Sequence, residues 1–97
     1  MQIIPDPTKF EWDEGNRDKN LLKHRVENQE IEEVFFNLPV LISPDVKHSA
    51  KETRYLVLGQ TDKHKKLSII FTIRRNKIRV ISARPMNQKE RIYYETK

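Results

Sequence analysis

The hydrophobic pattern of this chain changes its period once, at Pro39, and that change constrains the fold more than any other feature. Before Pro39, the apolar residues Ile31, Val34 and Phe35 fall at the spacing of a helix face. After Pro39, short apolar runs alternate with polar residues, most clearly over residues 67–74, which is typical of strands. Because helices come first and strands second, the sequence predicts an α+β fold with an antiparallel sheet.

Local signals predict the element order β-α-α-β-β-β-β-α. The expected strands span residues 10–12, 40–42, 53–60, 67–74 and 78–83, and the expected helices span residues 13–24, 29–36 and 88–95. The expected N-caps are Asp13, Asn28 and Asn87, and Asn76-Lys77 is expected to form a tight turn. The two N-terminal helices should pack against the apolar face of the sheet, and residues 1–97 should form a single domain.

Charge is distributed unevenly along the chain. Residues 1–47 contain six Lys/Arg and ten Asp/Glu, a balance of −4. Residues 48–97 contain thirteen Lys/Arg and four Asp/Glu, a balance of +9. Clustered positive charge attracts polyanions by neutralising phosphates and releasing counterions. A well-solvated basic surface without a specific ligand is the alternative, but the placement of the arginines on strands favours nucleic acid.

Six polar residues on or beside the predicted strands are candidates for an RNA site: His48, Glu52, Arg54, Arg74, Arg79 and Arg84. His48, Glu52 and Arg54 have the same parity, so they point to one side wherever the chain is extended. Arg74 has the parity of Thr72 on its strand, and Arg84 has the parity of Ile78 and Val80 on the next. Arginine holds phosphate oxygens with a planar fork of donors and stays charged near neutral pH. For Arg54 beside Glu52, a plain surface ion pair is the alternative.

The sequence offers no metal-ligand spacing, since its three histidines lie at positions 24, 48 and 64. We therefore expect no metal and no other cofactor. RNA cleavage without metal would use the 2′-hydroxyl as internal nucleophile, with a base beside it and cations at the phosphate. Glu52 and His48 are both candidates for the base, and Arg74 and Arg84 are candidates for the cations.

Four aromatic side chains could stack on unpaired bases, each stack being worth ~1–3 kcal/mol: Trp12, Tyr55, Tyr93 and Tyr94. Packing at the edge of the core is the alternative for all of them, and it is the favoured one for Trp12. The chain has no cysteine, no apolar run near the ~20 residues of a membrane span and no signal segment. A soluble, cytoplasmic protein without a membrane partner is therefore expected.

An ordered set of short motifs resembles the BrnT family of toxins from about Phe10 to Tyr94. The N-terminal part of the set is Phe10-Glu11-Trp12-Asp13-Glu14, Asn20-Leu21, Lys23-His24 and Glu33-Val34-Phe35. The C-terminal part is His48, Glu52-x-Arg54, Gly59, Leu67, Phe71-Thr72-x-Arg74, Ile78-Arg79-x-Ile81-Ser82-Ala83-Arg84 and Glu90-Arg91 with Tyr93 or Tyr94. No single motif is specific, but their order and spacing are.

This resemblance implies a RelE-like fold and a ribonuclease toxin of a bacterial type II toxin–antitoxin system, which blocks translation by cutting RNA. It also implies a BrnA-type ribbon-helix-helix antitoxin, a 2:2 toxin–antitoxin complex and contact with operator DNA only through the antitoxin. The catalytic candidates that it implies are His48, Glu52, Arg54, Arg74 and Arg84, and the RNA-binding candidates are Trp12, Arg79, Arg91 and Tyr94.

The chain departs from the family pattern at Arg25, where a glycine is usual after Lys-His. Glycine suits the left-handed position that closes a helix, and arginine there costs about 1 kcal/mol. We expect altered docking of the helices rather than lost activity. Two other functions stay open: a nucleic-acid-binding module without catalysis, and an interaction protein whose basic face meets an acidic partner.

Overall fold

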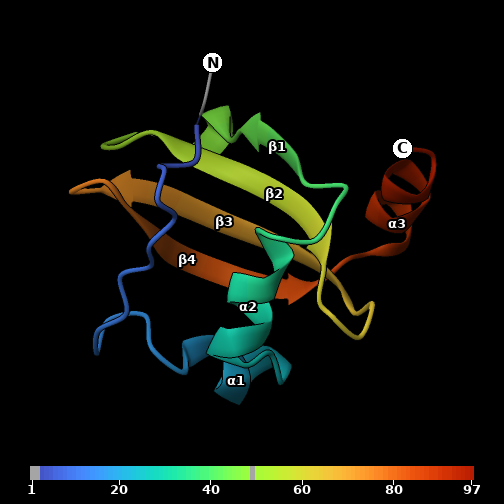
Figure 1. The fold of residues 1–97 in the computed structure, drawn as a ribbon, viewed down its shortest axis with the longest axis horizontal. Coiled ribbons are helices and arrows are strands. Elements are labelled where there is room, and N and C mark those ends of the chain that lie inside the picture. The colour runs from blue at the N-terminus through green and yellow to red at the C-terminus, as the bar shows by residue number, and fades with distance from the viewer. Residues whose placement is uncertain (1–2, 49) are drawn as a thin grey trace.

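The computed structural model describes residues 3–48 and 50–97, and of His48 it describes the backbone alone. In these residues a four-stranded antiparallel sheet of order β1-β2-β3-β4 is combined with three α-helices and one 3-10 turn (Figure 1). The strands are β1 (Leu41–Pro44), β2 (Arg54–Gln60), β3 (Lys66–Arg74) and β4 (Lys77–Pro85). The helices are α1 (Lys19–His24), α2 (Asn28–Val34) and α3 (Gln88–Glu95), with the 3-10 turn η1 at Val46–His48. The α+β class is confirmed, and the element order matches the prediction from the first helix onward.

Two predictions for the N-terminal segment are wrong in detail. The strand expected at residues 10–12 is a single bridge, in which Phe10 lies parallel to Ile78 of β4. The helix expected from Asp13 begins at Lys19, because Asp18 is left-handed (φ 60°) and a left-handed residue cannot continue an α-helix. Asp13 instead starts a turn, accepting the backbone N–H of Arg17 at 2.7 Å.

Two further boundaries move by one residue. Glu27, not Asn28, is the N-cap of α2, and it forms a reciprocal capping box with Glu30. The β3–β4 turn lies at Arg75-Asn76 rather than Asn76-Lys77, with positive φ at both positions (50° and 63°). Paired positive φ values match the twist of the flanking strands, which explains the two-residue turn. Asn87 caps α3 as predicted, accepting the N–H of Glu90 at 2.8 Å.

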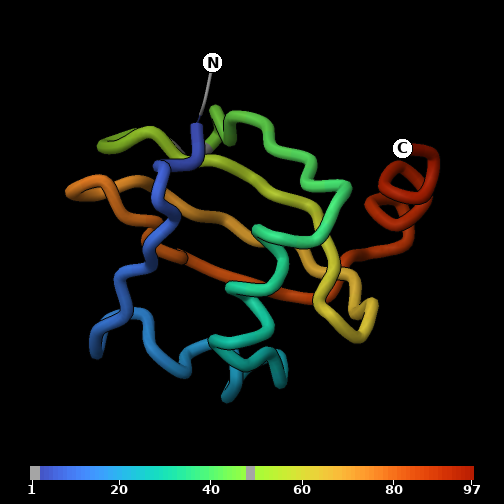
Figure 2. Tube along the Cα trace, in the orientation of Figure 1, coloured from blue at the N-terminus to red at the C-terminus, as the bar shows by residue number. Residues whose placement is uncertain are grey.

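The main core lies between the sheet and α2, and Figure 2 shows the N-terminal segment crossing the sheet on the same side. Fully or nearly fully buried side chains of alternate sheet residues meet α2 and Val26 there, and the cluster consists of Val26, Ile31, Val34, Phe35, Val57, Leu67, Ile69, Phe71, Ile78, Val80 and Ala83. Gly59 lets α2 approach β2, because a Cβ at this position would lie 2.6 Å from Val34 Cγ1. Helix α2 therefore lies on the apolar face, as the sequence predicts, whereas α1 lies along the edge of β4, where it buries Asn20.

Strand β4 contains a one-residue bulge at Ile81. Its partner β3 pairs Ile70 with Ser82 and Phe71 with Val80, so Ile81 has no opposite residue. Beyond the bulge the faces exchange: Ala83 is buried in the main core, although strict alternation from Val80 would turn it outward. The predicted parity of Arg84 with Ile78 and Val80 is therefore wrong, because the bulge turns Arg84 to the other face.

The outer edge of β4 is covered by the chain itself. The backbone N–H of Glu11 donates to Ile78 O at 2.8 Å. The buried amides of Asn16 and Asn20 then replace a neighbouring strand, Asn16 donating to Val80 O at 3.2 Å and Asn20 accepting from the Ala83 N–H at 2.9 Å. These bonds satisfy backbone groups that an edge strand would otherwise leave unpaired.

Helix α3 packs on the opposite side of the sheet from α2, over β1 and β2. Tyr94 is 3% exposed, lies in a second apolar cluster with Leu58 and Met86, and donates its hydroxyl to Pro39 O at 2.7 Å. Figure 1 shows α3 beside the end of the sheet, apart from α1 and α2. Within residues 3–48 and 50–97, no helix is long and apolar enough to cross a membrane.

Candidate nucleic-acid interface

The face of the sheet opposite α2 collects most of the predicted arginines, and we call it the open face. Register and alternation assign to it Arg54, Leu56, Leu58, Ser68, Ile70, Thr72, Arg74, Lys77, Arg79, Ser82 and Arg84. Arg54, Thr72 and Arg79 stand in one row across the strands, and Leu58, Ser68 and Arg84 stand in another. The structure thus brings Arg54, Arg74, Arg79 and Arg84 to one side of the molecule.

Arg74 and Arg84 nevertheless stand at opposite ends of this face. Arg84 pairs with Ser68, which lies six positions before Arg74 on β3. At about 3.3 Å per residue, the backbones of Arg74 and Arg84 are roughly 20 Å apart. We call the part around Glu52, Arg54 and Arg74 the hairpin end, and the part around Ser68, Arg84 and Glu90 the α3 end.

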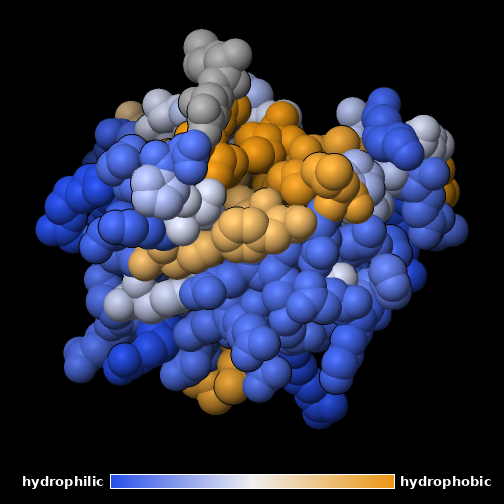
Figure 3. Space-filling view, in the orientation of Figure 1, coloured by the Kyte–Doolittle hydropathy of each residue, from blue (hydrophilic) through white to orange (hydrophobic). Residues whose placement is uncertain are grey.

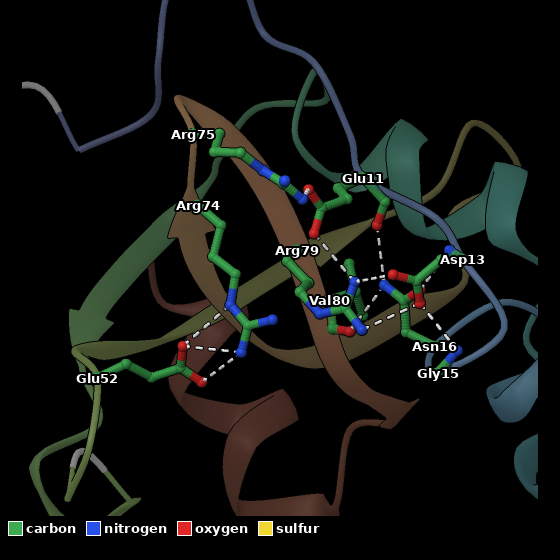
Figure 4. Close-up of polar contacts among 9 residues, drawn as sticks. All are labelled: Glu11, Asp13, Gly15, Asn16, Glu52, Arg74, Arg75, Arg79 and Val80. Atoms are coloured by element: carbon green, nitrogen blue, oxygen red, sulfur yellow. Dashed lines mark hydrogen bonds and ion pairs between the residues drawn. The ribbon is translucent and has the colours of Figure 1, made fainter.

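At the hairpin end, the carboxylate of Glu52 lies between two guanidinium groups. Arg74 donates from Nε and Nη2 to Glu52 Oε1 at 3.2 and 3.1 Å, and Arg54 Nη2 lies 3.5 Å from Glu52 Oε2. The Arg74 side chain is 47% exposed, which leaves its outer surface open to solvent. Figure 4 shows Arg74 turned toward Glu52 and away from the neighbouring acidic side chains of the N-terminal segment.

Arg79, in contrast, is enclosed by acidic groups of the N-terminal segment. Its Nη1 contacts Asp13 Oδ2 at 2.8 Å and Glu11 Oε1 at 3.0 Å, and its Nη2 donates to Asp13 Oδ1 at 3.1 Å (Figure 4). Hydrogen bonding to Asp13 and then to Glu11 raises the pKa of Arg79 above its usual value. Arg75 binds the other oxygen of Glu11 at 2.7 Å, and this bond is the main cause of the lowered pKa of Glu11. With 13% of its side chain exposed, Arg79 holds the N-terminal segment to β4.

At the α3 end, the guanidinium group of Arg84 forms a bidentate ion pair with Glu90 of α3. Its Nη1 and Nη2 lie 2.7 and 3.0 Å from Glu90 Oε1 and Oε2, and the Ser68 hydroxyl donates to Oε2 at 3.2 Å. The Glu90 pair raises the pKa of Arg84. Burial alone would raise the pKa of Glu90, but the bonds from Arg84, the Asn87 N–H and Ser68 together lower it. Glu90 was not among the site residues predicted from the sequence, although its place three residues after Asn87 is typical of a capping box at the start of a helix.

The aromatic candidates divide between the two sides of the molecule. Trp12 packs against the main core and donates its indole N–H to Glu32 of α2 at 2.7 Å, so it lies on the side away from the open face. Tyr94 is buried beneath α3, and this burial raises its pKa. Its neighbour Tyr93 is 53% exposed and lines a cavity between α3 and the open face. The sequence alone gave no basis for deciding which of these two adjacent tyrosines is available to RNA. Their different burial shows that it is Tyr93.

The remaining candidates are Arg91 and His48. Arg91 is an exposed residue of α3. His48 ends η1, and its side chain lies outside the described part of the structure. Among the described residues, no group of three or more His, Cys, Asp or Glu side chains is arranged to hold a metal ion.

Comparison with known families identifies the family of the chain. A family model described as the ribonuclease toxin BrnT of type II toxin–antitoxin systems matches residues 12–90. The chain belongs to this family. Members of this BrnT family are ribonuclease toxins, and a type II system implies an antitoxin partner. A search of curated proteins found no match.

The BrnT match includes both ends of the open face. Glu52, Arg54 and Arg74 of the hairpin end fall inside it, as do Arg84 and Glu90 of the α3 end. The match stops before Tyr93 and Tyr94, so the aromatic part of α3 is described by the structure alone. The open face of this BrnT-family chain therefore offers cations, one carboxylate at each end and an aromatic wall beside one of them.

Proposed function

We propose that the chain is a metal-independent endoribonuclease toxin with a RelE-like active site at the hairpin end of the open face. The observation that carries this proposal is the Glu52 carboxylate held between Arg54 and Arg74 on a solvent-facing sheet. A base next to two cations is the arrangement that cleavage through the 2′-hydroxyl requires. Family membership supports the ribonuclease class, and the ion triad supports the place.

In the proposed reaction, a phosphate of the RNA binds the exposed sides of Arg74 and Arg54 and weakens their ion pairs with Glu52. Glu52 then accepts the proton of the 2′-hydroxyl, the 2′-oxygen attacks phosphorus, and the bond to the 5′-oxygen breaks. The 5′-oxygen leaves with a proton, for which His48 is the proposed donor. The products are a 2′,3′-cyclic phosphate and a 5′-hydroxyl. The two guanidinium groups stabilise the negative charge that develops on the non-bridging phosphate oxygens, each contributing about 10²–10³ in rate.

We assign Arg84 to a different phosphate of the same strand. The backbones of Arg74 and Arg84 are roughly 20 Å apart, and the two side chains turn to different carboxylates, Glu52 and Glu90, so they face different positions along a bound strand. Because the Arg84 side chain is 43% exposed and its guanidinium group contacts a single carboxylate, it can bind a phosphate without disturbing the packing of the core. This assignment predicts that Arg84→Ala weakens RNA binding, whereas Glu52→Gln lowers the rate of cleavage.

The test is incubation of purified protein with labelled RNA, with and without EDTA, for wild type, Glu52→Gln and Arg74→Ala. Lys63→Ala is the matched control, because it removes one positive charge in the exposed loop between β2 and β3. We expect cleavage that survives EDTA, a loss of about 10²-fold or more in both hairpin-end variants and none in the control. Abolition by EDTA would contradict metal independence, and unchanged cleavage by Glu52→Gln would remove this residue from the reaction.

We further propose that the antitoxin is of the BrnA type and binds as a 2:2 complex. The basic half of the chain, with its balance of +9, supports an acidic toxin-binding segment in this partner. The ribbon-helix-helix part of the antitoxin would carry the contact to operator DNA. Light scattering of the co-expressed pair tests the stoichiometry, and gel shifts with and without the antitoxin test the route to DNA. Operator binding by the toxin alone would contradict this proposal.

A further inference from the structure

The cavity under α3 is the feature that the proposed reaction does not use. It has a volume of about 380 Å³ and lies between α3 and the β1–β2 end of the open face. Its floor is apolar, formed by Leu41, Leu56 and Leu58, and its wall on α3 carries Lys89, Glu90 and Tyr93. Cavities of roughly 300 Å³ and above accommodate small organic ligands, and an apolar floor with a few polar groups at the rim is their common lining.

Charge and position decide which ligand suits this cavity. Glu90 is shared between the cavity wall and Arg84, so the cavity lies directly beside the arginine that we assign to a phosphate. Lys89 is at the rim, and the Lys97 ammonium lies 4.6 Å from the centre of the Tyr93 ring. A ligand that combines a flat apolar body with a nearby negative charge fits these surroundings. A nucleotide has this combination in its base and phosphate.

Glu90 lines the cavity but has no acceptor site left to hydrogen-bond a base. Its Oε1 accepts from Arg84 and from the Asn87 N–H, and its Oε2 accepts from Arg84 and Ser68. A carboxylate has about four acceptor sites, so these four bonds occupy it. Recognition of a base in the cavity therefore falls to the Tyr93 ring, the leucine floor and Lys89.

We propose that this cavity is a nucleobase subsite, in which an unpaired base of bound RNA stacks on Tyr93 while Arg84 holds its phosphate. The inference rests on the proposed function and adds the place where a nucleotide outside the cleaved bond is held. RNA would then cross the open face from the hairpin end to the α3 end, and Tyr93 would position the strand without contacting the reacting atoms.

The experiment measures binding without cleavage, using fluorescence anisotropy with single-stranded oligonucleotides that carry 2′-O-methyl groups. Tyr93→Ala should weaken binding by about 5- to 150-fold, since one base stack on an aromatic side chain is worth ~1–3 kcal/mol. Tyr93→Phe should bind within about twofold of wild type, because stacking does not need the hydroxyl. Ile92→Ala is the matched control: Ile92 is the adjacent residue of α3, is 58% exposed and does not line the cavity.

Oligonucleotides with one abasic position identify the base that occupies the cavity. Wild type should lose affinity when the missing base is the one that stacks on Tyr93, and Tyr93→Ala should be indifferent to the same change. Equal losses in both proteins at every position, or an unchanged affinity of Tyr93→Ala, would overturn the subsite. A loss of antitoxin binding with RNA binding intact would overturn it too and assign the cavity to the partner.

Cleavage assays on the same variants separate this proposal from the proposed function. If wild type does not cut RNA but shows the abasic signature, the nuclease fails and the subsite stands. If wild type cuts RNA and Tyr93→Ala binds it normally, the subsite fails and the nuclease stands.

Discussion

Arg79 and Arg84 stand on the same strand and the same face of the sheet, yet their surroundings differ. Arg79 has both Asp13 and Glu11 around its fork and exposes 13% of its side chain. Arg84 has one carboxylate, that of Glu90, and exposes 43%. An arginine enclosed by two acidic groups holds protein to protein, whereas one with a single acidic partner and an open side has further N–H groups available to a phosphate. A basic face therefore contains structural and functional arginines that composition cannot separate.

The bulge at Ile81 brings these two arginines to one face, so altering its length should have the largest effect. Inserting an alanine after Ile81 should keep Ala83 inward by alternation but move residues 82–85 two positions along β3, which breaks the pairing of Arg84 with Ser68 and should strongly destabilise the protein. Deleting Ile81 should be tolerated, because the pairs on both sides of the bulge are already those of a strand one residue shorter. Circular dichroism melts of the two variants test this; a deletion that unfolds the protein would show that the bulge has a further role.

Measuring both RNA affinity and melting temperature for Arg79→Ala and for Arg84→Ala tests the comparison directly. Arg84→Ala should weaken RNA binding by about ten- to a hundredfold, the value of one charge-assisted hydrogen bond, and should lower the melting temperature less than Arg79→Ala, because it removes one partly exposed ion pair. Arg79→Ala should lower the melting temperature by several degrees, because Glu11 and Asp13 lose their shared partner and the N-terminal segment loosens. Anisotropy and calorimetry on both proteins decide the matter, and equal effects of the two changes on RNA affinity would contradict it.

Acid titration sharpens the comparison at the α3 end. Because the pKa of Glu90 is lowered in the folded protein, its contribution to stability is present above its ordinary value of 4.5 and is lost as pH falls through the folded value. Glu90→Gln should therefore be less stable than wild type at pH 7 by up to ~1 kcal/mol, since half of the pair is solvent-screened. The difference should shrink below pH 4.5. Urea unfolding at pH 7 and pH 3.5 measures this difference in free energy of unfolding. A difference that does not change with pH would show that it does not come from the charge of Glu90.

The smallest expected effect on stability comes from a third arginine, Arg25, and its cause is backbone conformation rather than an ion pair. It closes α1 in the left-handed conformation, with φ 58° and ψ 37°. Glycine adopts this conformation without steric penalty, so Arg25→Gly should stabilise the protein by about 0.5–1 kcal/mol. Neither RNA binding nor cleavage should change, because the residue lies beside α1 and away from the open face. Arg25→Gln is the control for lost charge, because it removes the charge but keeps a side chain at the left-handed position, and it should leave stability unaltered.

The elements of the fold were predictable because their signals are local. Alternation over β3, the asparagine before α3 and the period change at Pro39 each depend on neighbouring residues alone. The bulge at Ile81 depends on the pairing of β4 with β3, so parity assigned Arg84 to the wrong face. Asp18 stops the first helix through a backbone conformation that its residue type permits but does not require.

For the candidate site, sequence supplied the residue types and the structure supplied the partners. The pairing of Glu52 with Arg54 is two residues apart and visible in the sequence, but its bond to Arg74 spans 22 residues. Glu90 binds Arg84 because the chain turns at Met86 and Asn87 and brings the first turn of α3 back to the side chain of Arg84. Neither contact has a periodic signal, so only the fold reveals which carboxylate belongs to which arginine.

The side-chain cover on β4 also determines how another chain could extend this sheet. Asn16 and Asn20 occupy the backbone positions that an incoming strand would use, and they are 3% and 2% exposed. A foreign strand would have to expel both amides and rebuild their bonds before gaining any of its own. Sheet-to-sheet assembly through β4 is thus blocked by two small amides, and the protein can carry a long, β-rich and strongly basic hairpin without growing along this edge.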